Sequence, residues 1–109
     1  MNRAPQHCQL CRRRIANLTK HHLIPRMRHR NKKTRKQFAR QEMTTRIAWL
    51  CRPCHTQVHA LFSEKQLAAS YHSIAALRQH PDMGKFIEWI SGKAENFIPR
   101  TLTSTSKYS

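Results

Sequence analysis

The sequence has no long apolar run, few acidic residues and only two glycines. No stretch of its 109 residues approaches the roughly 20 apolar side chains that cross a bilayer, which excludes a membrane-spanning helix. No apolar stretch follows the opening residues MNRAPQHC, so we expect no secretory signal and a cytoplasmic protein. A chain of this length allows one small domain with a modest core.

Acidic residues number five against 21 lysines and arginines, which gives a formal charge of +16. The excess lies in residues 1–62, where 15 basic residues and one acid, Glu42, leave +14. Residues 63–109 hold six basic and four acidic residues and carry +2. Such a charge is typical of polyanion binding, because nucleic acid phosphates exchange their condensed counterions for basic side chains. A solvated basic face is the alternative reading of charge alone.

The chain divides into a core with an insert, a helical extension and a tail. Residues 1–62 form the predicted core, which contains a basic insert at 26–46. The first half of the insert lacks apolar periodicity and is expected to be a loop, or a helix ordered only on binding. We expect residues 63–98 to form helices packed on the core, and residues 99–109 to form a disordered tail.

Local patterns predict two short strands and several helices. The segment ANLTKHHLI suits a strand that ends at Pro25, and IAWL suits a second strand before the later cysteine pair. Ser63 and Gln66 predict a capping box, and Ser73 predicts a further helix start. Pro81 begins a third helix of this region. Its apolar stripe consists of Met83, Phe86, Ile87 and Ile90.

Two CxxC pairs form one prominent motif. A two-residue gap places both thiolates of a pair within tetrahedral reach of one ion, and two pairs complete a structural zinc site. Disulfides in a secreted domain are the alternative, against which the tight gaps and the missing signal argue. The predicted zinc ligands are Cys8, Cys11, Cys51 and Cys54.

Histidines supply a second candidate site. His55 and His59 are four residues apart, which on a helix places both imidazoles on one face. Cys54 precedes His55 and is turned about 100° from it around such a helix, so one ion can hardly bind both neighbours. His21 and His22 offer imidazoles on another element. The sequence therefore predicts two metals, one on cysteines and one on histidines.

These residues occur in motifs that resemble the HNH endonucleases, the cysteine-bearing ββα-metal nucleases. HHLIP occupies residues 21–25, LCRPCHTQVH occupies residues 50–59, and the resemblance runs from Cys8 to His59. It implies an α+β fold with a small ββα-metal core (the His-Me finger), a four-cysteine zinc site and C-terminal helices. The activity it implies is that of a metal-dependent DNA endonuclease or nickase that hydrolyses phosphodiester bonds.

The resemblance also implies roles for four histidines. Imidazole, with a pKa of about 6.5, can accept a proton from the attacking water near neutrality. A divalent cation (Mg²⁺, Mn²⁺, Ni²⁺ or Zn²⁺) can stabilise charge at the scissile phosphate. Neighbours on a regular strand point to opposite faces, so we expect an irregular strand end at the histidine pair. By position, the catalytic metal ligands are His21, His55 and His59, and the general base is His22.

One position departs from the family pattern. The family's central asparagine, which braces the loop that orients the base, corresponds to Arg46. An arginine side chain cannot accept a hydrogen bond, so it cannot copy both roles of an amide. It can instead contact a phosphate or stabilise charge in the transition state, which makes Arg46 a candidate catalytic residue. Asn31, inside the insert, is badly placed to replace the missing amide.

The expected partner is DNA, in double-stranded form. Basic side chains that contact phosphates position the duplex and carry little sequence information. Specific cutting by so small a protein often requires a homodimer or a larger protein partner. The predicted phosphate contacts are Arg26, Arg28, Arg30, Lys32, Lys33, Arg35, Lys36 and Arg40.

Two other functions are compatible with the sequence. A non-catalytic nucleic-acid-binding zinc module with a lapsed HNH centre needs the cysteines and the charge, but no metal on the histidines. A protein-interaction adaptor would use the helices between Ser63 and Gly92, with Trp49 and Trp89 as anchors, although both tryptophans fit better as packing residues. The number of bound metal ions separates the enzyme from the binding module.

Overall fold

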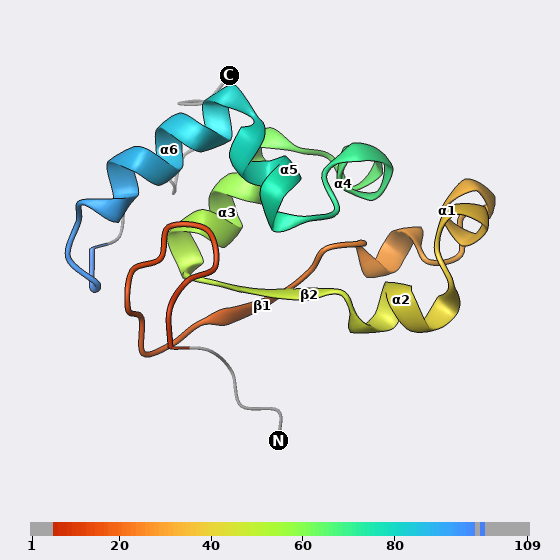
Figure 1. Cartoon of the computed structure of the whole chain (residues 1–109), viewed down its shortest axis with the longest axis horizontal. Helices are drawn as coiled ribbons and strands as arrows, with labels where there is room; N and C mark the ends of the chain where they lie inside the picture. The colour runs from red at the N-terminus through yellow and green to blue at the C-terminus, as the bar shows by residue number, and fades with distance from the viewer. Residues whose placement is uncertain (1–5, 98, 100–109) are drawn as a thin grey trace.

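The computed structural model describes residues 6–97 and residue 99. The fold is a small α+β arrangement of one two-stranded sheet and several short helices (Figure 1). The strands are β1 (Thr19–His22) and β2 (Ile47–Leu50). The helices are the 3-10 helix η1 (Arg26–Arg28), α1 (Lys32–Gln37), α2 (Arg40–Thr45), α3 (Arg52–Leu61), α4 (Glu64–Ser70), α5 (Ile74–Gln79) and α6 (Pro81–Ser91).

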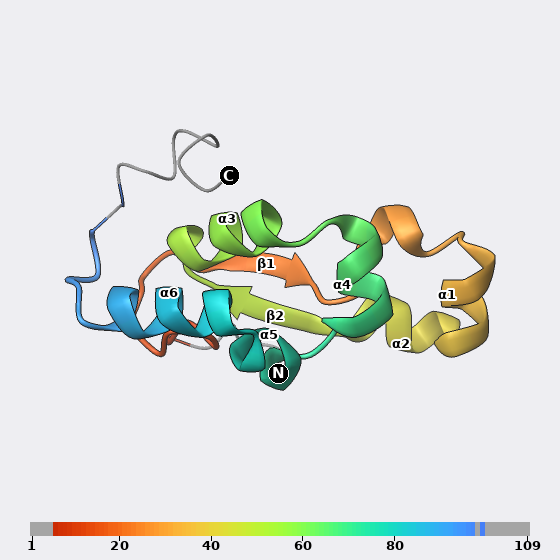
Figure 2. The ribbon, with the colours of Figure 1, turned by 90° about the horizontal axis from the view of Figure 1, so that it is seen from above.

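The two strands pair antiparallel, with Thr19 opposite Leu50 and His22 opposite Ile47. The N-terminal segment pairs with the other edge of β2 through Gln9: its amide donates to the Trp49 carbonyl at 2.9 Å, and its Oε1 accepts from the Trp49 amide at 2.6 Å. Helix α3 begins directly after β2 and contacts β1 (Figure 2). This order therefore places β1, which carries His21, beside α3, which carries His55 and His59.

Serine caps begin two of the C-terminal helices, as the sequence predicts. Ser63 Oγ accepts from the Gln66 amide at 3.1 Å, and Gln66 Oε1 accepts from the Ser63 amide at 2.9 Å, which confirms the capping box. Ser73 Oγ accepts from the Ala76 amide at 3.1 Å and begins α5. In the predicted apolar stripe of α6, Ile87 is half-buried and the buried side chains are Met83, Phe86 and Ile90.

One hydrophobic cluster joins the cysteines to the C-terminal helices. Leu50 of β2 and Val58 of α3 are fully buried in this cluster. Leu67, Leu77 and Ile90 enter it from α4, α5 and α6. Because residues on both sides of position 63 bury their apolar surface together, the cysteine-bearing half and the helical extension stabilise one another.

The first half of the basic insert is helical, which corrects the expectation of a loop there. It forms η1 and α1. Asn31 Oδ1 accepts hydrogen bonds from the amides of Lys33 and Thr34 at 3.1 and 3.2 Å and so caps α1. Asn31 is therefore a helix cap of the insert, consistent with its exclusion as a substitute for the family asparagine.

A second hydrophobic cluster attaches the insert to the rest of the fold. Phe38 and Met43 of the insert are each 5% exposed and pack with Ile24 and Ala68. The sequence does not reveal this cluster, because its members come from separate elements and form no periodic stripe. Burial of these side chains against Ile24 and Ala68 stabilises the insert on the fold, which explains why its short helices form.

The predicted tail at 99–109 lies outside the described residues except for Pro99. That proline is fully buried and therefore belongs to the packed part of the chain. Within the described residues, no helix is both long enough and apolar enough to cross a membrane.

Candidate metal centres

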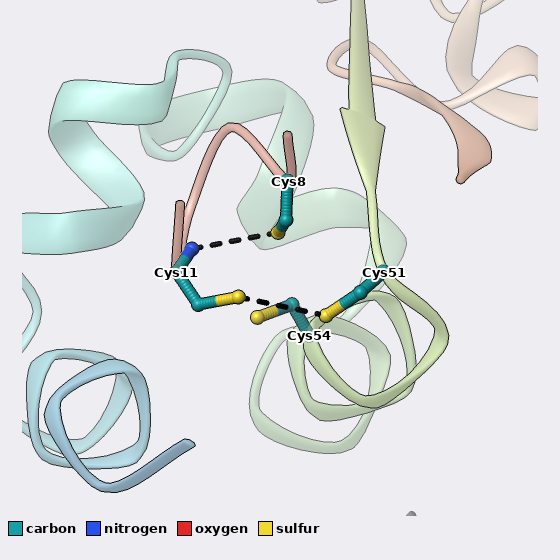
Figure 3. A group of neighbouring side chains, drawn as sticks. All are labelled: Cys8, Cys11, Cys51 and Cys54. Atoms are coloured by element: carbon teal, nitrogen blue, oxygen red, sulfur yellow. Dashed lines mark hydrogen bonds between the residues drawn. The ribbon is translucent and has the colours of Figure 1, made fainter. Parts of the chain in front are cut away.

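Four buried cysteines converge from three parts of the fold (Figure 3). Cys8 and Cys11 lie in the N-terminal segment, Cys51 follows β2, and Cys54 lies in the first turn of α3. Each is at most 4% exposed, and the four sulfur atoms lie within 4.8 Å of one another. The predicted cysteine cluster is confirmed, and no disulfide forms among these cysteines.

The sulfur spacing suits a tetrahedral metal ion. Cys11 Sγ and Cys51 Sγ are 3.8 Å apart. Four bonds of about 2.3 Å in a tetrahedron around zinc separate the sulfur atoms by about 3.8 Å. The cluster can therefore hold a structural metal ion such as zinc.

Mutual hydrogen bonding makes the thiols unequal as acids. Hydrogen bonds from the other cysteines, and from Arg13, hold the pKa of Cys11 far below its usual value. Donation to Cys11 raises the pKa of Cys51 and of Cys54 far above that value. The first thiolate therefore forms readily and the last ones do not. A dication resolves this conflict, because it stabilises all four thiolates together.

Arg13 contacts both cysteine pairs and a distant part of the chain. Its side chain is buried, with Nε 3.4 Å from Cys11 Sγ and Nη2 3.5 Å from Cys51 Sγ. Its Nη1 donates to the Ala94 carbonyl, just beyond α6, at 2.6 Å. A dication with four thiolates carries a net charge of −2, so the guanidinium offsets part of that charge while fixing the segment after α6.

Three histidines form a second group beside the first. His21 comes from β1, and His55 and His59 come from one face of α3. One ring nitrogen of each lies within 4.8 Å of the others. The ring centroid of His21 is 5.1 Å from that of His55 and 5.3 Å from that of His59. The structure thus brings together the three predicted ligands of the catalytic metal.

The electrostatics of this group favour neutral imidazoles. Burial, and then the neighbouring His55 and His59, lower the pKa of His21 to about 3. Burial also lowers the pKa of His55. His21 Nε2 is buried and has no hydrogen-bond partner among the described residues. An unpartnered nitrogen in a buried neutral imidazole is costly unless something binds it, and a metal ion is the partner that this donor set fits.

His22 follows His21 but does not belong to the histidine group. β1 ends at His22, so the strand end expected from the sequence falls at the histidine pair, although the pairing stays regular up to His22 and Ile47. His22 lies close enough to His21 to contribute to the lowered pKa of His21. Burial, followed by the neighbouring Arg26, His29 and Lys20, lowers the pKa of His22. This imidazole is therefore neutral at pH 7 and able to accept a proton.

Arg46 directs its side chain to the insert and the turn after α4. Its Nη1 is 3.5 Å from Glu42 Oε2 and 3.4 Å from His72 Nδ1, and its guanidinium lies 5.9 Å from the Phe38 ring centroid. The structure does not bring this side chain into the histidine group. The Arg46 carbonyl instead accepts from the Leu23 amide at 3.0 Å, which extends the strand pairing past His22.

The predicted phosphate contacts lie on the surface of the insert. Seven of the eight basic side chains are exposed, and Arg28 is half-buried. Among the described residues, Arg28 Nε is buried and has no hydrogen-bond partner. The insert is thus a folded platform with a basic surface, in which Phe38 and Met43 are buried and Met27 is exposed.

The comparisons with known proteins give one relationship. No family model matches this chain, and no solved structure matches it. A Bacillus subtilis (strain 168) protein described as uncharacterized protein YisB is 33% identical over 102 residues, which cover 92% of this chain and 88% of YisB. The chain belongs to the family of YisB. YisB itself is described as uncharacterized. The activity of this family is therefore inferred from the geometry of the candidate metal centres.

Sequence reasoning missed Arg52 in this YisB-family chain. Arg52 is exposed at the start of α3, and with Thr56 one turn later it lines an open pocket of about 490 Å³. The remaining lining residues are Thr19, His55 and His59. Arg52 lies within the CxxC motif, whose pattern marks only the cysteines. Because it lines the pocket together with two candidate ligands, it is a candidate contact for an anionic substrate.

Proposed function

We propose that this protein is a metal-dependent DNA endonuclease or nickase with a ββα-metal core of the HNH type. The observation that carries the proposal is the convergence of His21, from a strand, with His55 and His59, from the helix that follows the second strand. Three neutral nitrogen ligands leave coordination positions open, which distinguishes a catalytic site from a closed structural one.

The cysteine cluster supports the same proposal as the scaffold of that core. Cys51 and Cys54 stand at the junction of β2 and α3, immediately before His55. Zinc on the four cysteines would fix the start of α3 and hence the position of its histidines. In a domain this small, the free energy of metal binding contributes directly to folding.

The chemistry divides between the bound ion and this chain's side chains. A divalent ion on the three histidines would supply positive charge at the scissile phosphate and at the leaving 3′ oxygen. His22 takes the proton of the attacking water, and its lowered pKa keeps it in the basic form at neutral pH. Arg52 binds a phosphate oxygen in the pocket beside His55 and His59.

The segment directly after the base is braced by two contacts in this chain. The Leu23 amide donates to the Arg46 carbonyl at 3.0 Å, and His29 Nε2 is 2.7 Å from the Ile24 carbonyl. These contacts take the bracing role of the family asparagine, with the backbone of Arg46 in place of an amide side chain. Arg46→Ala should therefore retain most of the cleavage rate.

DNA is the proposed partner because of the exposed basic surface of the insert. Its phosphate contacts would hold the duplex next to the end of β1, where His22 lies. A second copy of the chain or a larger protein partner would add the contacts that specific cutting by so small a protein often requires.

The test is cleavage of supercoiled plasmid with added Mg²⁺, Mn²⁺, Ni²⁺ or Zn²⁺. His22→Ala should lose about 10²–10⁴ in rate while it retains its melting temperature and DNA affinity. His7→Ala is the matched control, because His7 is exposed and lies outside the histidine group. Wild-type protein that cuts with none of these metals rejects the enzyme.

A second variant tests the pocket. Arg52→Met should raise the KM for DNA and lower the cleavage rate, because a phosphate in the pocket loses its charged partner. Arg78→Met, which removes an exposed arginine from α5, is the control for the change of net charge. Equal losses in both variants would mean that Arg52 acts only through long-range charge.

The second candidate function is a non-catalytic nucleic-acid-binding zinc module. One observation favours it: the Arg46 side chain contacts Glu42 and His72. No side chain from this position therefore takes the place of the family's asparagine amide. One tightly bound zinc per chain and no exchangeable second ion would identify this module. Two ions per chain, one of them exchangeable, would identify the enzyme.

A further inference from the structure

Thr19 makes two hydrogen bonds that together fix the proton on His55. Thr19 Oγ1 donates to the Leu50 carbonyl at 2.7 Å, and it lies 2.8 Å from His55 Nδ1. A threonine hydroxyl has one proton, and a carbonyl can only accept. The hydroxyl proton is therefore committed to Leu50, and Thr19 Oγ1 accepts from His55. His55 consequently carries its proton on Nδ1.

Glu64 acts on His59 through its charge. Glu64 Oε1 lies 3.3 Å from His59 Nδ1. A carboxylate oxygen repels the lone pair of a ring nitrogen and attracts its proton, so this ion-pair contact favours the proton of His59 on Nδ1. Glu64 is the first residue of α4 and His59 lies in the last turn of α3, so the short connection between the two helices holds the pair together.

Both contacts leave the same atom free for a metal ion. A neutral imidazole that is protonated on Nδ1 presents the lone pair of Nε2. His21 adds a third Nε2, which is buried and without a partner among the described residues. The three histidines thus present one kind of nitrogen, while oxygen acceptors from β1 and α4 occupy the far side of two of the rings.

We propose that Thr19 and Glu64 are positioning residues that hold His55 and His59 in the Nδ1–H tautomer, so that their Nε2 atoms join that of His21 in binding one divalent cation. The inference rests on the proposed metal centre but does not require that the centre cut DNA. It also assigns a role to the helical extension, because Glu64 completes from α4 a site whose ligands lie in β1 and α3. Metal ligands commonly need such partners to fix ring orientation.

Long-range proton–nitrogen NMR of the histidine side chains tests the tautomers directly. The sample is the full chain at pH 8 with one equivalent of zinc, which fills the cysteine cluster and leaves the histidines free. His55 and His59 should both give the Nδ1–H pattern. Thr19→Val should move His55 toward the Nε2–H form and leave His59 unchanged, and Thr19→Ser should restore the wild-type pattern. An Nε2–H pattern for His55 or His59 in the wild type overturns the inference.

Glu64→Ala should change the pattern of His59 alone. Asp82→Ala is its matched control, because Asp82 is likewise an acid in the first turn of a helix, α6, and has no contact with the histidine group. A change at His59 in the Asp82 variant would show that helix stability, and not the carboxylate, sets the tautomer, and would overturn the role of Glu64.

Co²⁺ titration of the same zinc-loaded protein measures the consequence for binding. Thr19→Val and Glu64→Ala should each weaken Co²⁺ binding about 10–100-fold, and Thr19→Ser should recover most of the loss. Wild-type affinity in Thr19→Val and in Glu64→Ala would overturn the inference. A wild-type chain that binds Co²⁺ on histidines with these tautomers but leaves plasmid uncut would reject the nuclease and support the assignment of Thr19 and Glu64.

Discussion

Arg13 Nη1 donates a hydrogen bond to the Ala94 carbonyl at 2.6 Å, across 81 residues of sequence. The same guanidinium reaches a sulfur atom of Cys11 and one of Cys51. One buried cation thus connects the cysteine cluster with the segment that follows α6. Loss of metal and loosening of that segment should therefore accompany one another.

Arg13→Met should weaken zinc retention and expose the segment around Ala94. The uncharged side chain keeps much of the buried volume but cannot donate to the sulfurs or to the carbonyl, and charge-assisted hydrogen bonds contribute about 1.5–3 kcal/mol each. Competition with a chromogenic chelator measures the affinity, and hydrogen exchange of residues 93–97 measures the loosening. Arg14→Met is the control, because Arg14 is exposed. Unchanged exchange in Arg13→Met would mean that the contact with Ala94 is incidental.

Cys51→Ser should abolish the cooperative fold. Cys51 is fully buried, within reach of the other three sulfurs, and its loss breaks a site whose binding free energy is folding free energy. Thermal unfolding followed by circular dichroism should show no transition, and DNA binding should disappear with it. The wild type treated with a strong chelator should behave in the same way. A folded, DNA-binding variant would remove the structural role assigned to the cysteines.

Arg12→Gly should stabilise the protein. Arg12 has a φ of 68° in the turn between the cysteine pair and Arg13, and this left-handed conformation costs about 1–2 kcal/mol for a residue with a Cβ. Glycine adopts it without that cost but loses more entropy on folding, so the net gain is about 1 kcal/mol. Chemical denaturation measures the free energy of unfolding. Arg12→Ala, which removes the long side chain and keeps the Cβ, should show no such gain.

The stability of the wild type should fall as the pH is lowered through the range set by His21. The pKa of His21 is about 3 in the fold and about 6.5 in the unfolded chain, so the unfolded state binds more protons between these values. Burial of His21 therefore does not lower the free energy of unfolding above about pH 6.5. Below that pH it lowers the free energy of unfolding by up to about 1.4 kcal/mol per pH unit as the pH falls toward 3. His21→Asn should flatten this slope in denaturation series between pH 6.5 and 5, whereas an identical slope would place another group in control.

Neutralising the insert should change the salt dependence of DNA binding. Lys32, Lys33, Arg35 and Lys36 are exposed, and their replacement by glutamine should make the slope of log affinity against log salt shallower by about 0.9 for each phosphate that the variant no longer neutralises. The matched control replaces four exposed basic residues outside the insert by glutamine: Lys65, Arg78, Lys85 and Lys93. Equal changes in both variants would show that net charge, and not the insert, sets the slope.

The sequence by itself determined which cysteines and histidines are candidate metal ligands, and where two of the C-terminal helices start. CxxC pairs and a histidine pair four residues apart restrict which side chains can share an ion, because the spacing within a turn or a helix is fixed by the backbone. The caps at Ser63 and Ser73 are equally local, since each serine bonds an amide three residues ahead. Such features depend on only a few consecutive residues, so the sequence alone predicts them.

Only the tertiary structure decided which side chains surround those ligands. Arg13, Thr19 and Glu64 belong to no motif, and Arg52 lies in the CxxC motif only as a spacer. Their contacts with the cysteine and histidine groups depend on how separate elements pack. The sequence left the first half of the insert open between a loop and a helix for the same reason, because the cluster that stabilises it joins Phe38 to residues of other elements. Long-range burial follows from the shape of the whole core, whereas ligand spacing follows from the local backbone.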